Sequence, residues 1–357
     1  MEALITLLPG DGIGPEVTSS GKKILSTIEE IYDHKFSYEE KLIGGSAIDA
    51  GHLPLPEETI ASCRESNAII LGAVGGPKWS DPNAKVRPEQ GLLGLREILK
   101  VFANIRPVKV MPELISASPL KKELLENVDL VVIRELTGGI YFGEKYKDDN
   151  HASDLCIYHD YEVDRIVRLA SNIAMTRRKK LASIDKANVL ETSRFWRNRT
   201  NNIVTTEFPD IDLEHILVDA AAMYLISKPS EFDVIVTENM FGDILTDEAS
   251  MLAGSMGMLP SASIGEGVKG LYEPIHGSAP DIAGQGVANP CGMILSIALL
   301  LRYSLKLEDE ASFLEKSVEN VISAGARTKD IATTGQVVLN TEEMTNCIIR
   351  DLKKNNS

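Results

Sequence analysis

The chain has 357 residues, of which 43% are hydrophobic and 25% are charged, a mixture typical of soluble globular proteins. It carries 37 basic and 52 acidic side chains, which gives a formal net charge of −15. A surface this acidic repels phosphate groups and therefore argues against nucleic acid or an anionic membrane as the main partner. The length corresponds to roughly two domains, and any anionic ligand would need a local cluster of Arg or Lys.

The cysteines and the apolar segments favour a cytoplasmic protein. Cys63, Cys156, Cys291 and Cys347 form no CxxC pair, and four thiols in so long a chain do not make a disulfide scaffold. Residues 1–8 lack the basic start and the cleavage site of a signal peptide. The longest apolar stretch, residues 293–301, is far shorter than a membrane span and predicts a buried helix.

Apolar segments typical of strands alternate along the chain with segments of helical periodicity. The predicted strands are residues 4–8, 68–74, 130–133, 181–184, 216–218 and 234–236. The predicted helices are residues 15–31, 92–102, 293–303 and 310–324, with a loop-rich stretch at 254–292. This alternation predicts an α/β fold with helices on both faces of a sheet. Because no low-complexity linker separates two domains, we expect domains that interleave or share a sheet.

The glycine-rich loop after the first strand does not fit a dinucleotide fingerprint. Gly10, Gly12 and Gly14 lie between a predicted strand and a predicted helix, which is the usual context of GxGxxG. The spacing fails, because Pro15 or Val17 stands where the third glycine is needed. Asp11 would also place a negative charge beside the pyrophosphate. The loop therefore predicts a tight turn before a helix, and not a Rossmann fold.

Three acidic residues stand at predicted strand-to-helix junctions. Asp243 and Asp247 are four residues apart, so they share one helical face, where two like charges repel. A divalent cation such as Mg²⁺ or Mn²⁺ would give this pair a purpose. The alternative is a pair of acids attracted by the dipole at a helix N-terminus, which spacing alone favours. Asp219 begins another predicted helix, where a plain N-cap is the alternative.

Three arginines, Arg96, Arg106 and Arg134, each close an apolar run. We expect them at strand or helix ends around the mouth of a cleft. The planar fork of arginine binds a carboxylate through two parallel hydrogen bonds, so three of them would suit a dicarboxylate. The alternative is three separate surface ion pairs, which are common for single arginines.

Two further motifs carry groups that could move protons or wrap a ligand. Lys186 follows a predicted strand and could act as a base, while Tyr141 lies in a glycine-flanked turn and could donate a proton. A surface lysine and a packed tyrosine are the alternatives. Residues 273–284 combine turn formers with His, Ser and Asp, which predicts a loop that wraps a ligand with its backbone. Without a GxSxG elbow, a Ser–His–Asp triad is not expected.

Taken in order, these motifs resemble the decarboxylating β-hydroxyacid dehydrogenases, the isocitrate/isopropylmalate dehydrogenase family. The resemblance runs from Leu7 to about Gln336 and depends most on residues 239–248 and 276–284. It implies a two-domain α/β fold with a shared mixed sheet flanked by helices. Residues 1–100 and 253–357 would then bind the cofactor. Residues 101–252 would carry the metal, the substrate and the dimer contacts, including an arm at about 134–160.

The resemblance also implies a role for each motif residue. It assigns catalysis to Tyr141 and Lys186, and Mg²⁺ or Mn²⁺ binding to Asp219, Asp243 and Asp247. It assigns substrate binding to Arg96, Arg106, Arg134, Asp219, Leu92, Leu93 and Val189. It assigns NAD binding to Glu273, His276, Gly277, Ser278, Ala279, Asp281, Ile282 and Asn289. The family's homodimer builds each site from both subunits, so Lys186 and Asp219 would come from the partner.

The substrate implied by the resemblance depends on one helix. Leu92 and Leu93 stand where isocitrate dehydrogenases usually carry Ser or Asn, and this segment is similar to the branch that acts on 3-isopropylmalate. The implied reaction is its NAD-dependent oxidative decarboxylation to 4-methyl-2-oxopentanoate and CO2 in leucine biosynthesis. A D-malate or tartrate dehydrogenase is the nearest alternative. A catalytically silent subunit is another, although such a subunit should have lost the Lys, Tyr or Asp residues that are present here.

The cofactor loop generates the first prediction. A carboxylate at Asp281 can accept hydrogen bonds from both ribose hydroxyls of NAD, whereas the 2′-phosphate of NADP would meet like charge. NADP-using relatives tend to carry Lys and Tyr in place of Asp281 and Ile282. The wild type should therefore prefer NAD in kcat/KM, and Asp281→Lys combined with Ile282→Tyr should shift the preference toward NADP. Equal use of both cofactors by the wild type would contradict the assignment.

Overall fold

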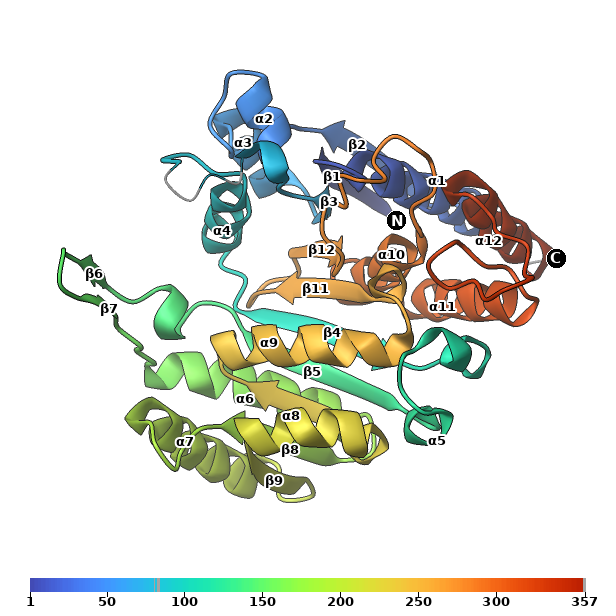
Figure 1. Ribbon diagram of the computed structural model, residues 1–357. Helices are drawn as coiled ribbons and strands as arrows, with labels where there is room; N and C mark the ends of the chain where they lie inside the picture. The colour runs from blue at the N-terminus through green and yellow to red at the C-terminus, as the bar shows by residue number, and fades with distance from the viewer. Residues whose placement is uncertain (80, 82–83, 356–357) are drawn as a thin grey trace. The chain divides into compact units, whose positions relative to one another are not determined.

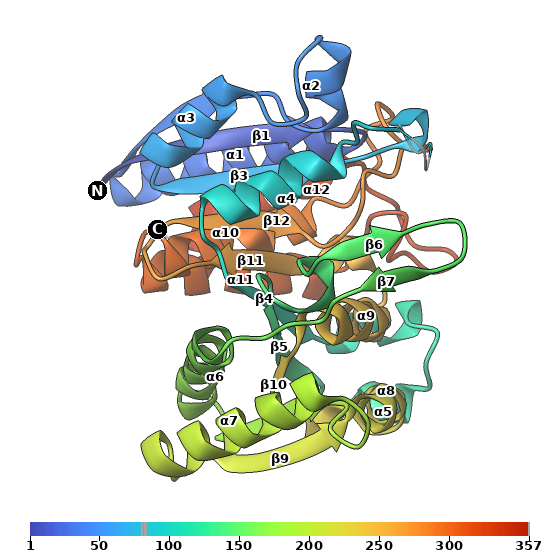
Figure 2. The same ribbon diagram turned by 90° about the vertical axis from the view of Figure 1, so that its left-hand side faces the viewer.

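The computed structural model describes residues 1–79, 81 and 84–355 and contains two compact units. Unit 1 comprises Met1–Val101 with Gly254–Ser357, and unit 2 comprises Phe102–Ala253. Each unit has strands covered by helices on both faces (Figures 1 and 2), so the predicted α/β class is confirmed. Of the helices in the described part of the chain, none is long and apolar enough to cross a membrane.

The strands of unit 1 follow the order β2-β1-β3-β12-β11. Their bounds are β1 Glu2–Gly10, β2 Lys35–Glu40, β3 Ala68–Ala73, β11 Pro260–Ile264 and β12 Gly270–Pro274. β1 is parallel to β2 and β3, and β12 is parallel to β3, while β11 and β12 are antiparallel. Every residue of β3 is buried, because a strand covered on both faces must be apolar throughout.

Two groups of helices cover the strands of unit 1. One group is α1 (Gly14–Tyr32), α10 (Cys291–Tyr303), α11 (Glu308–Ser323) and α12 (Thr341–Asn355), which pack on one another. The other is α2 (Gly45–Asp49), α3 (Glu57–Glu65) and α4 (Glu89–Ile98). Leu95 of α4 and Cys63 of α3 are fully buried in one cluster with Leu8 and Leu71 of the strands. This cluster fixes the helix that carries Leu92, Leu93 and Arg96.

The strands of unit 2 follow the order β4-β5-β10-β8-β9. Their bounds are β4 Ala103–Lys109, β5 Asp129–Glu135, β8 Lys180–Asp185, β9 Asp212–Leu217 and β10 Val234–Thr237. β4 and β5 are antiparallel, and the other pairs are parallel. Helices α6 (Asp160–Met175) and α7 (Glu191–Glu207) pack on one face. Helices α8 (Val218–Ser227) and α9 (Asn239–Ser250) pack on the other, as Figure 2 shows from the side.

Short elements complete unit 2. Helix α5 (Lys122–Leu125) lies between β4 and β5 in the chain. Strands β6 (Lys145–Lys147) and β7 (Ala152–Asp154) form a separate antiparallel hairpin, which reaches out from the rest of this unit in Figure 1. All residues of both strands are exposed. This arm therefore lacks a packing partner within its own unit. An isolated two-stranded hairpin is marginally stable at best in water.

The glycine loop of unit 1 supports a second loop of the same unit. Gly10 and Gly12 have positive φ angles of 70° and 59°, which glycine adopts without strain. The Ile13 amide donates to the Ser278 carbonyl at 2.8 Å, and a Cβ at Gly12 would lie 1.9 Å from the same oxygen. Asp11 accepts hydrogen bonds from the amides of Gly45, Ser46 and Gly75. The loop is thus filled by protein backbone, as the failed GxGxxG spacing predicts.

The sequence predictions were wrong at several elements. Residues 254–292 were expected to be rich in loops but contain β11 and β12. These strands were missed because their short apolar pairs are interrupted by Ser and Pro. Strand β2 and helix α12 were not predicted. The predicted helix at 92–102 ends at Ile98, where Lys100 takes a positive φ of 53°, and the predicted strand at 216–218 ends at Leu217. What each unit binds, and whether they share one sheet, stay predictions.

Candidate active site

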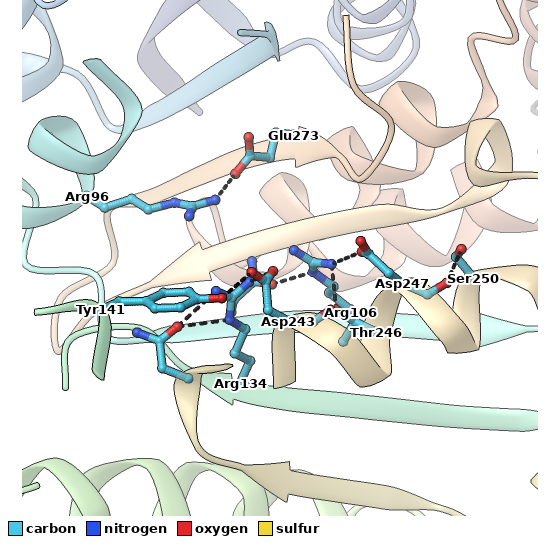
Figure 3. A network of polar contacts seen from close by, with 11 residues as sticks. Arg96, Arg106, Arg134, Tyr141, Asp243, Thr246, Asp247, Ser250 and Glu273 are labelled. Carbon is cyan, nitrogen blue, oxygen red and sulfur yellow. Dashed lines mark hydrogen bonds and ion pairs between the residues drawn. The ribbon is translucent and has the colours of Figure 1, made fainter. Parts of the chain in front are cut away.

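Helix α9 turns one polar stripe toward strands β4 and β5. Its buried residues Phe241, Leu245 and Ala249 are spaced by four, which is the periodicity of a helix face against a core. Asp243, Thr246 and Asp247 lie on a neighbouring face and contact two arginines of the strands (Figure 3). The run at 239–248 therefore folds as a helix that meets the arginines along its length.

Arg134, the next-to-last residue of β5, is buried under α9. Its Nη1 donates to the Asp243 carboxylate, and its Nε and Nη2 donate to Asn239 Oδ1 at 3.1 and 2.9 Å. A Cβ at Gly242 would lie 2.7 Å from Arg134 Cγ. Glycine at this helix position therefore leaves the space that the arginine stem occupies.

Arg106 lies in the middle of β4, and not at a strand end as expected. Its Nε donates to Asn104 Oδ1 and its Nη1 to Thr246 Oγ1, both at 2.7 Å, and Nη1 is 3.5 Å from Asp247 Oδ1. Residues 104 and 106 point to the same side of β4, and Asn104 is directly opposite Arg134 of β5. The strand pair thus brings both arginines to one face.

These contacts decide between the alternatives left open for the acids and the arginines. The first turn of α9 contains no acidic residue, so attraction by the helix dipole does not explain Asp243 and Asp247. The side chains of Arg106 and Arg134 are only 13% and 6% exposed, so they are not surface ion pairs. Asp219 is in the first turn of α8 but is not its N-cap, which is Leu217.

Tyr141 lies in a short 3₁₀ turn, Gly139–Tyr141, and its hydroxyl donates to Asp243 Oδ2 at 3.0 Å. Arg134 is 5.9 Å from the centre of its ring. Partial burial, followed by the negative charge of Asp243, raises the pKa of the Tyr141 phenol above its usual range. The phenol therefore stays protonated at neutral pH, as a proton donor must.

Lys186 and Asp219 form a second pair in unit 2, at the ends of β8 and β9. The Lys186 ammonium donates to Asp219 Oδ1 at 2.5 Å, and this hydrogen bond lowers the pKa of the Asp219 carboxyl. Val189, also expected near the substrate, is exposed three residues after Lys186. The side chains of Lys186 and Asp219 are thus in contact and accessible to solvent.

The carboxylates of α9 offer part of a divalent metal site. Asp243 and Asp247 present hard oxygen ligands one helical turn apart, and Asp247 is 74% exposed, so both suit Mg²⁺ or Mn²⁺ with water and substrate completing the shell. Within the described residues, no group of three or more acidic, His or Cys side chains is placed to hold a metal. Asp219 therefore does not complete this site within one chain.

In unit 1, Arg96 near the end of α4 is paired with Glu273 of β12. Its Nη2 is 2.7 Å from Glu273 Oε1 (Figure 3), and both side chains are mostly buried. Leu92, one turn earlier, packs partly on the apolar cluster beneath α4, whereas Leu93 is exposed. Glu273, expected to contact the cofactor, thus contacts a predicted substrate arginine of its own unit.

The loop after β12 has several features of a ligand-binding backbone. The Nε2 of His276 is buried and has no hydrogen-bond partner among the described residues, and burial lowers the pKa of this ring. A Cβ at Gly277 would meet nothing within 4 Å. Asp281 is exposed and its carboxylate has no partner in the described part of the chain, so it does not cap its own turn. These residues fit a nucleotide whose base offers an amino group to the His276 ring and whose ribose offers a diol to Asp281.

The other residues predicted in this loop are held by protein contacts. Ser278 is buried and its carbonyl accepts from Ile13, while Ala279 takes a positive φ of 37° and Ile282 donates its amide back to Ala279. Asn289 is buried, with its amide nitrogen 3.0 Å from Asp330 and its oxygen accepting from the Cys291 amide at the start of α10. Its side chain is therefore committed to the protein.

Comparisons with known proteins agree with this arrangement. Residues 4–348 match the sequence family described as isocitrate/isopropylmalate dehydrogenase. The chain belongs to the isocitrate/isopropylmalate dehydrogenase family. A 3-isopropylmalate dehydrogenase of Anaeromyxobacter dehalogenans is 59% identical over 93% of this chain and 95% of its own length, and that of Bacillus subtilis is 55% identical over 93% and 92%. The crystal structure of isocitrate dehydrogenase from Methylococcus capsulatus has a TM-score of 0.85 at 32% identity, covering 98% of this chain and 99% of its own.

The structure of this family member adds residues that the sequence reasoning missed. Asn104, Asn239 and Thr246 bind the two arginines, and Gly242 makes room for one of them. The spacing of Asn104 and Arg106, two apart on a strand, was the available signal. Glu238, the N-cap of α9, is buried and accepts a hydrogen bond from Ser193 at 2.5 Å. Nothing in the sequence pattern distinguishes it from a surface acid.

The close approach at Gly242 generates a prediction. Gly242→Ala should displace Arg134 because the new methyl group lies 2.7 Å from its Cγ. We expect a loss of about 1–3 kcal/mol in the free energy of unfolding, as for other overpacked sites, and a higher KM for an anionic substrate. Gly94→Ala in α4 is the control, because the nearest atom lies at 3.5 Å and helix propensity alone should then stabilise. Equal effects of both variants on stability would contradict the close packing.

Glu238 generates a prediction about pH. Burial raises the pKa of the Glu238 carboxyl to about 7, with the charge of Asp185 adding to the effect. As pH rises from the ordinary pKa of a glutamate toward 7, Glu238 loses its proton in the unfolded chain but keeps it in the folded state. The free energy of unfolding of the wild type therefore falls. Glu238→Gln removes this dependence, and its stability advantage over the wild type should grow by about 2 kcal/mol between pH 5 and pH 8. Urea denaturation at several pH values measures this.

Glu191→Gln is the control, because Glu191 is 85% exposed on α7 and should leave the pH dependence of stability as in the wild type. A constant difference between Glu238→Gln and the wild type over this pH range would show that Glu238 is already ionised in the folded protein.

Proposed function

We propose that this protein catalyses the NAD-dependent oxidative decarboxylation of 3-isopropylmalate to 4-methyl-2-oxopentanoate and CO2, a step of leucine biosynthesis in the cytoplasm. The observation that carries the proposal is the face of unit 2 where Arg106 and Arg134 lie beside Asp243 and Asp247. It combines two guanidinium groups that can bind carboxylates with two carboxylates that can bind a divalent cation. The names of the relatives at 52–59% identity agree with this substrate.

Substrate binding begins from arginines that are already oriented. Arg106 and Arg134 bind the two carboxylates of the malate group, because each keeps Nη donors beside the stripe of α9. Water screens the charge of a surface arginine. A guanidinium group with little exposure is screened less and therefore attracts a carboxylate more strongly. Arg96, which the resemblance assigns to the same substrate, stays a prediction.

The metal and the dinucleotide supply the redox part of the chemistry. Asp243 and Asp247 would hold Mg²⁺ or Mn²⁺, and the loop from His276 to Asn289 would hold NAD. When bound, the cation provides positive charge at the C2 oxygen and NAD accepts the hydride from C2. In the loop, the buried Nε2 of His276 is available to the adenine, and the exposed Asp281 to the ribose diol.

Lys186 and Tyr141 divide the proton transfers. Lys186, as the free amine, takes the proton of the C2 hydroxyl, and the ionised Asp219 stabilises the ammonium that forms. After CO2 leaves, Tyr141 protonates the enolate carbon, for which its raised pKa keeps the phenol in the acid form. Asp243 orients the hydroxyl through the 3.0 Å hydrogen bond.

A homodimer with shared sites completes the proposal. Asp219 does not join Asp243 and Asp247 in a metal cluster within the described part of one chain, so the partner's Asp219 and the partner's Lys186 would serve the site. Met223 of α8 and Ile244 of α9 are 61% and 60% exposed on helices that pack side by side. Exposed apolar side chains on adjacent helices favour a buried interface, and the unsupported β6–β7 arm would gain a partner there.

The competing functions are less well supported. A silent subunit should lack some of the acid, base and metal groups, yet Tyr141, Lys186, Asp219, Asp243 and Asp247 are all present. A D-malate or tartrate dehydrogenase differs from the proposal only in the alkyl pocket, for which Leu92 and Leu93 are the candidates. A spectrophotometric screen of 3-isopropylmalate, D-malate, tartrate and isocitrate, with NAD or NADP and with or without chelator, tests the function. Activity on 3-isopropylmalate that needs NAD and metal is expected, and full activity in excess chelator contradicts the metal.

The alkyl pocket generates a prediction. Leu92→Ser should lower kcat/KM for 3-isopropylmalate by about 10- to 200-fold, because lost apolar contact with an alkyl branch is worth about 1–3 kcal/mol. The same change should improve the relative use of D-malate. Leu99→Ser, which disturbs the same apolar cluster at the end of α4, is the control for a general loss of packing. An unchanged preference among the malates would mean that Leu92 acts only in the core.

Shared sites generate a further prediction. Inactive Lys186→Ala and inactive Tyr141→Phe, mixed and allowed to exchange subunits, should regain roughly a quarter of wild-type activity, because half the dimers are mixed and each has one intact site. Lys186→Ala mixed with Asp219→Asn is the matched control and should stay inactive, since both residues are supplied by the same partner. No recovery in the first mixture after confirmed exchange would contradict shared sites.

A further inference from the structure

The arginines of unit 2 differ in what their Nε atoms contact. In Arg106 and Arg134, Nε donates to an asparagine amide oxygen, Asn104 Oδ1 at 2.7 Å and Asn239 Oδ1 at 3.1 Å. In Arg168, Arg177, Arg197 and Arg199 of the same unit, Nε contacts a carboxylate at 2.7 to 2.9 Å, and in Arg194 it donates to the Ala187 carbonyl at 2.9 Å. At Nε, the two arginines proposed to bind substrate thus contact neutral groups, whereas four others contact acids; the acids near Arg106 and Arg134, Asp247 and Asp243, lie on the Nη side.

Both asparagines are fixed by their surroundings. They are essentially fully buried, where an amide must be hydrogen-bonded to avoid a large desolvation cost. Since a guanidinium only donates, the amide oxygen must face the arginine in each pair. Asn239 also donates through Nδ2 to the Gly138 carbonyl at 3.2 Å, and its backbone amide donates to the Tyr158 hydroxyl at 2.9 Å. Its side chain therefore cannot rotate without breaking its hydrogen bonds to Arg134 and to the Gly138 carbonyl.

The neutral charge of these groups matters for substrate binding. A carboxylate in place of the amide would have nearly the same shape and would bind Nε more strongly. It would also neutralise the guanidinium and repel the carboxylates of the substrate. An amide oxygen directs the guanidinium without adding a negative charge to those of Asp243 and Asp247, which matters in a protein whose net charge is −15.

We propose that Asn104 and Asn239 are positioning residues that aim Arg106 and Arg134 at the substrate's carboxylates without placing a further negative charge beside them. The inference rests on the proposed function and extends it to residues that touch no reacting atom. Asn239 has a second connection, because Gly138 belongs to the turn that leads to Tyr141. Asn239 therefore couples the orientation of Arg134 to the place of the proton donor.

Comparison of Asp and Ala variants separates positioning from simple structural support. Asn104→Asp should retain or increase thermal stability, because a carboxylate pairs well with Nε, but should raise KM for 3-isopropylmalate about tenfold or more through repulsion of the substrate. Asn104→Ala should lose stability but raise KM less than Asn104→Asp. If the asparagine only supports the fold, stability and substrate affinity fall together and the Asp variant is the milder of the two. That order would overturn the proposal.

Asn239→Asp adds a test of the coupling to Tyr141. It keeps the acceptor for Arg134 but replaces the donor to the Gly138 carbonyl with a second acceptor. We expect both a higher KM and a lower kcat, whereas Asn104→Asp should change kcat by less than threefold. Asn202→Asp on the exposed side of α7 adds the same charge to unit 2 and should leave both constants unchanged. A kcat of Asn239→Asp equal to that of the wild type would overturn the coupling.

Binding is also measured without turnover, as the rise in melting temperature on adding 3-isopropylmalate with Mg²⁺. The rise should shrink in both Asp variants and persist in Asn202→Asp. A wild type that neither binds nor oxidises 3-isopropylmalate would contradict the proposed function. If the wild type binds 3-isopropylmalate but no better than Asn104→Asp does, the proposed role of the asparagines is wrong and the proposed function is not affected.

Discussion

The contact between Arg134 of β5 and helix α9 is the constraint on which the rest of the site depends. One guanidinium meets Asn239 at the first residue of the helix and Asp243 one turn later. Gly242 lies between them and lets the helix approach the arginine stem. Because Tyr141 donates to the same Asp243, the position of α9 on the strands sets the arginine, the candidate metal ligand and the proton donor together.

Charge in this site is arranged against the background of an acidic protein. Asp243 and Asp247 lie beside two nearly buried arginines, Arg134 and Arg106. The opposite charges limit the cost of burying the guanidinium groups. The same carboxylates are candidate ligands for a divalent cation, so metal binding and the release of arginine donors for the substrate involve the same side chains.

The polar residues at the start of α9 are buried and hydrogen-bonded. Glu238 at the start of α9 is buried with one hydroxyl partner, Ser193, and its pKa is raised to about 7. Asn239, the next residue, is buried with every polar group used. Two adjacent positions thus hold an acid that burial favours in its neutral form and an amide that carries no charge, so neither adds a full negative charge beside Arg134 and Asp243.

Local patterns in the sequence were enough to predict the fold class, the family and most candidate residues. Alternating strand and helix patterns predicted the α/β architecture, and the runs at 239–248 and 276–284 are specific enough to indicate the family, as the match over residues 4–348 confirms. Prediction from the sequence failed where the pattern is short or ambiguous. β11 and β12 lie in a stretch rich in Gly and Pro, and helix spacing could not tell whether Asp243 and Asp247 were a dipole pair or part of a site.

Which side chains contact one another across elements follows from the packing of the folded chain. Asn104 and Arg134 are 30 positions apart in the numbering, and the antiparallel register of β4 and β5 places them opposite one another. Arg106 contacts Thr246 and Arg134 contacts Asn239 because α9 packs on that strand pair. Local periodicity specifies the face of each element, but the contacts between faces depend on packing of segments far apart in the chain, which no local pattern encodes.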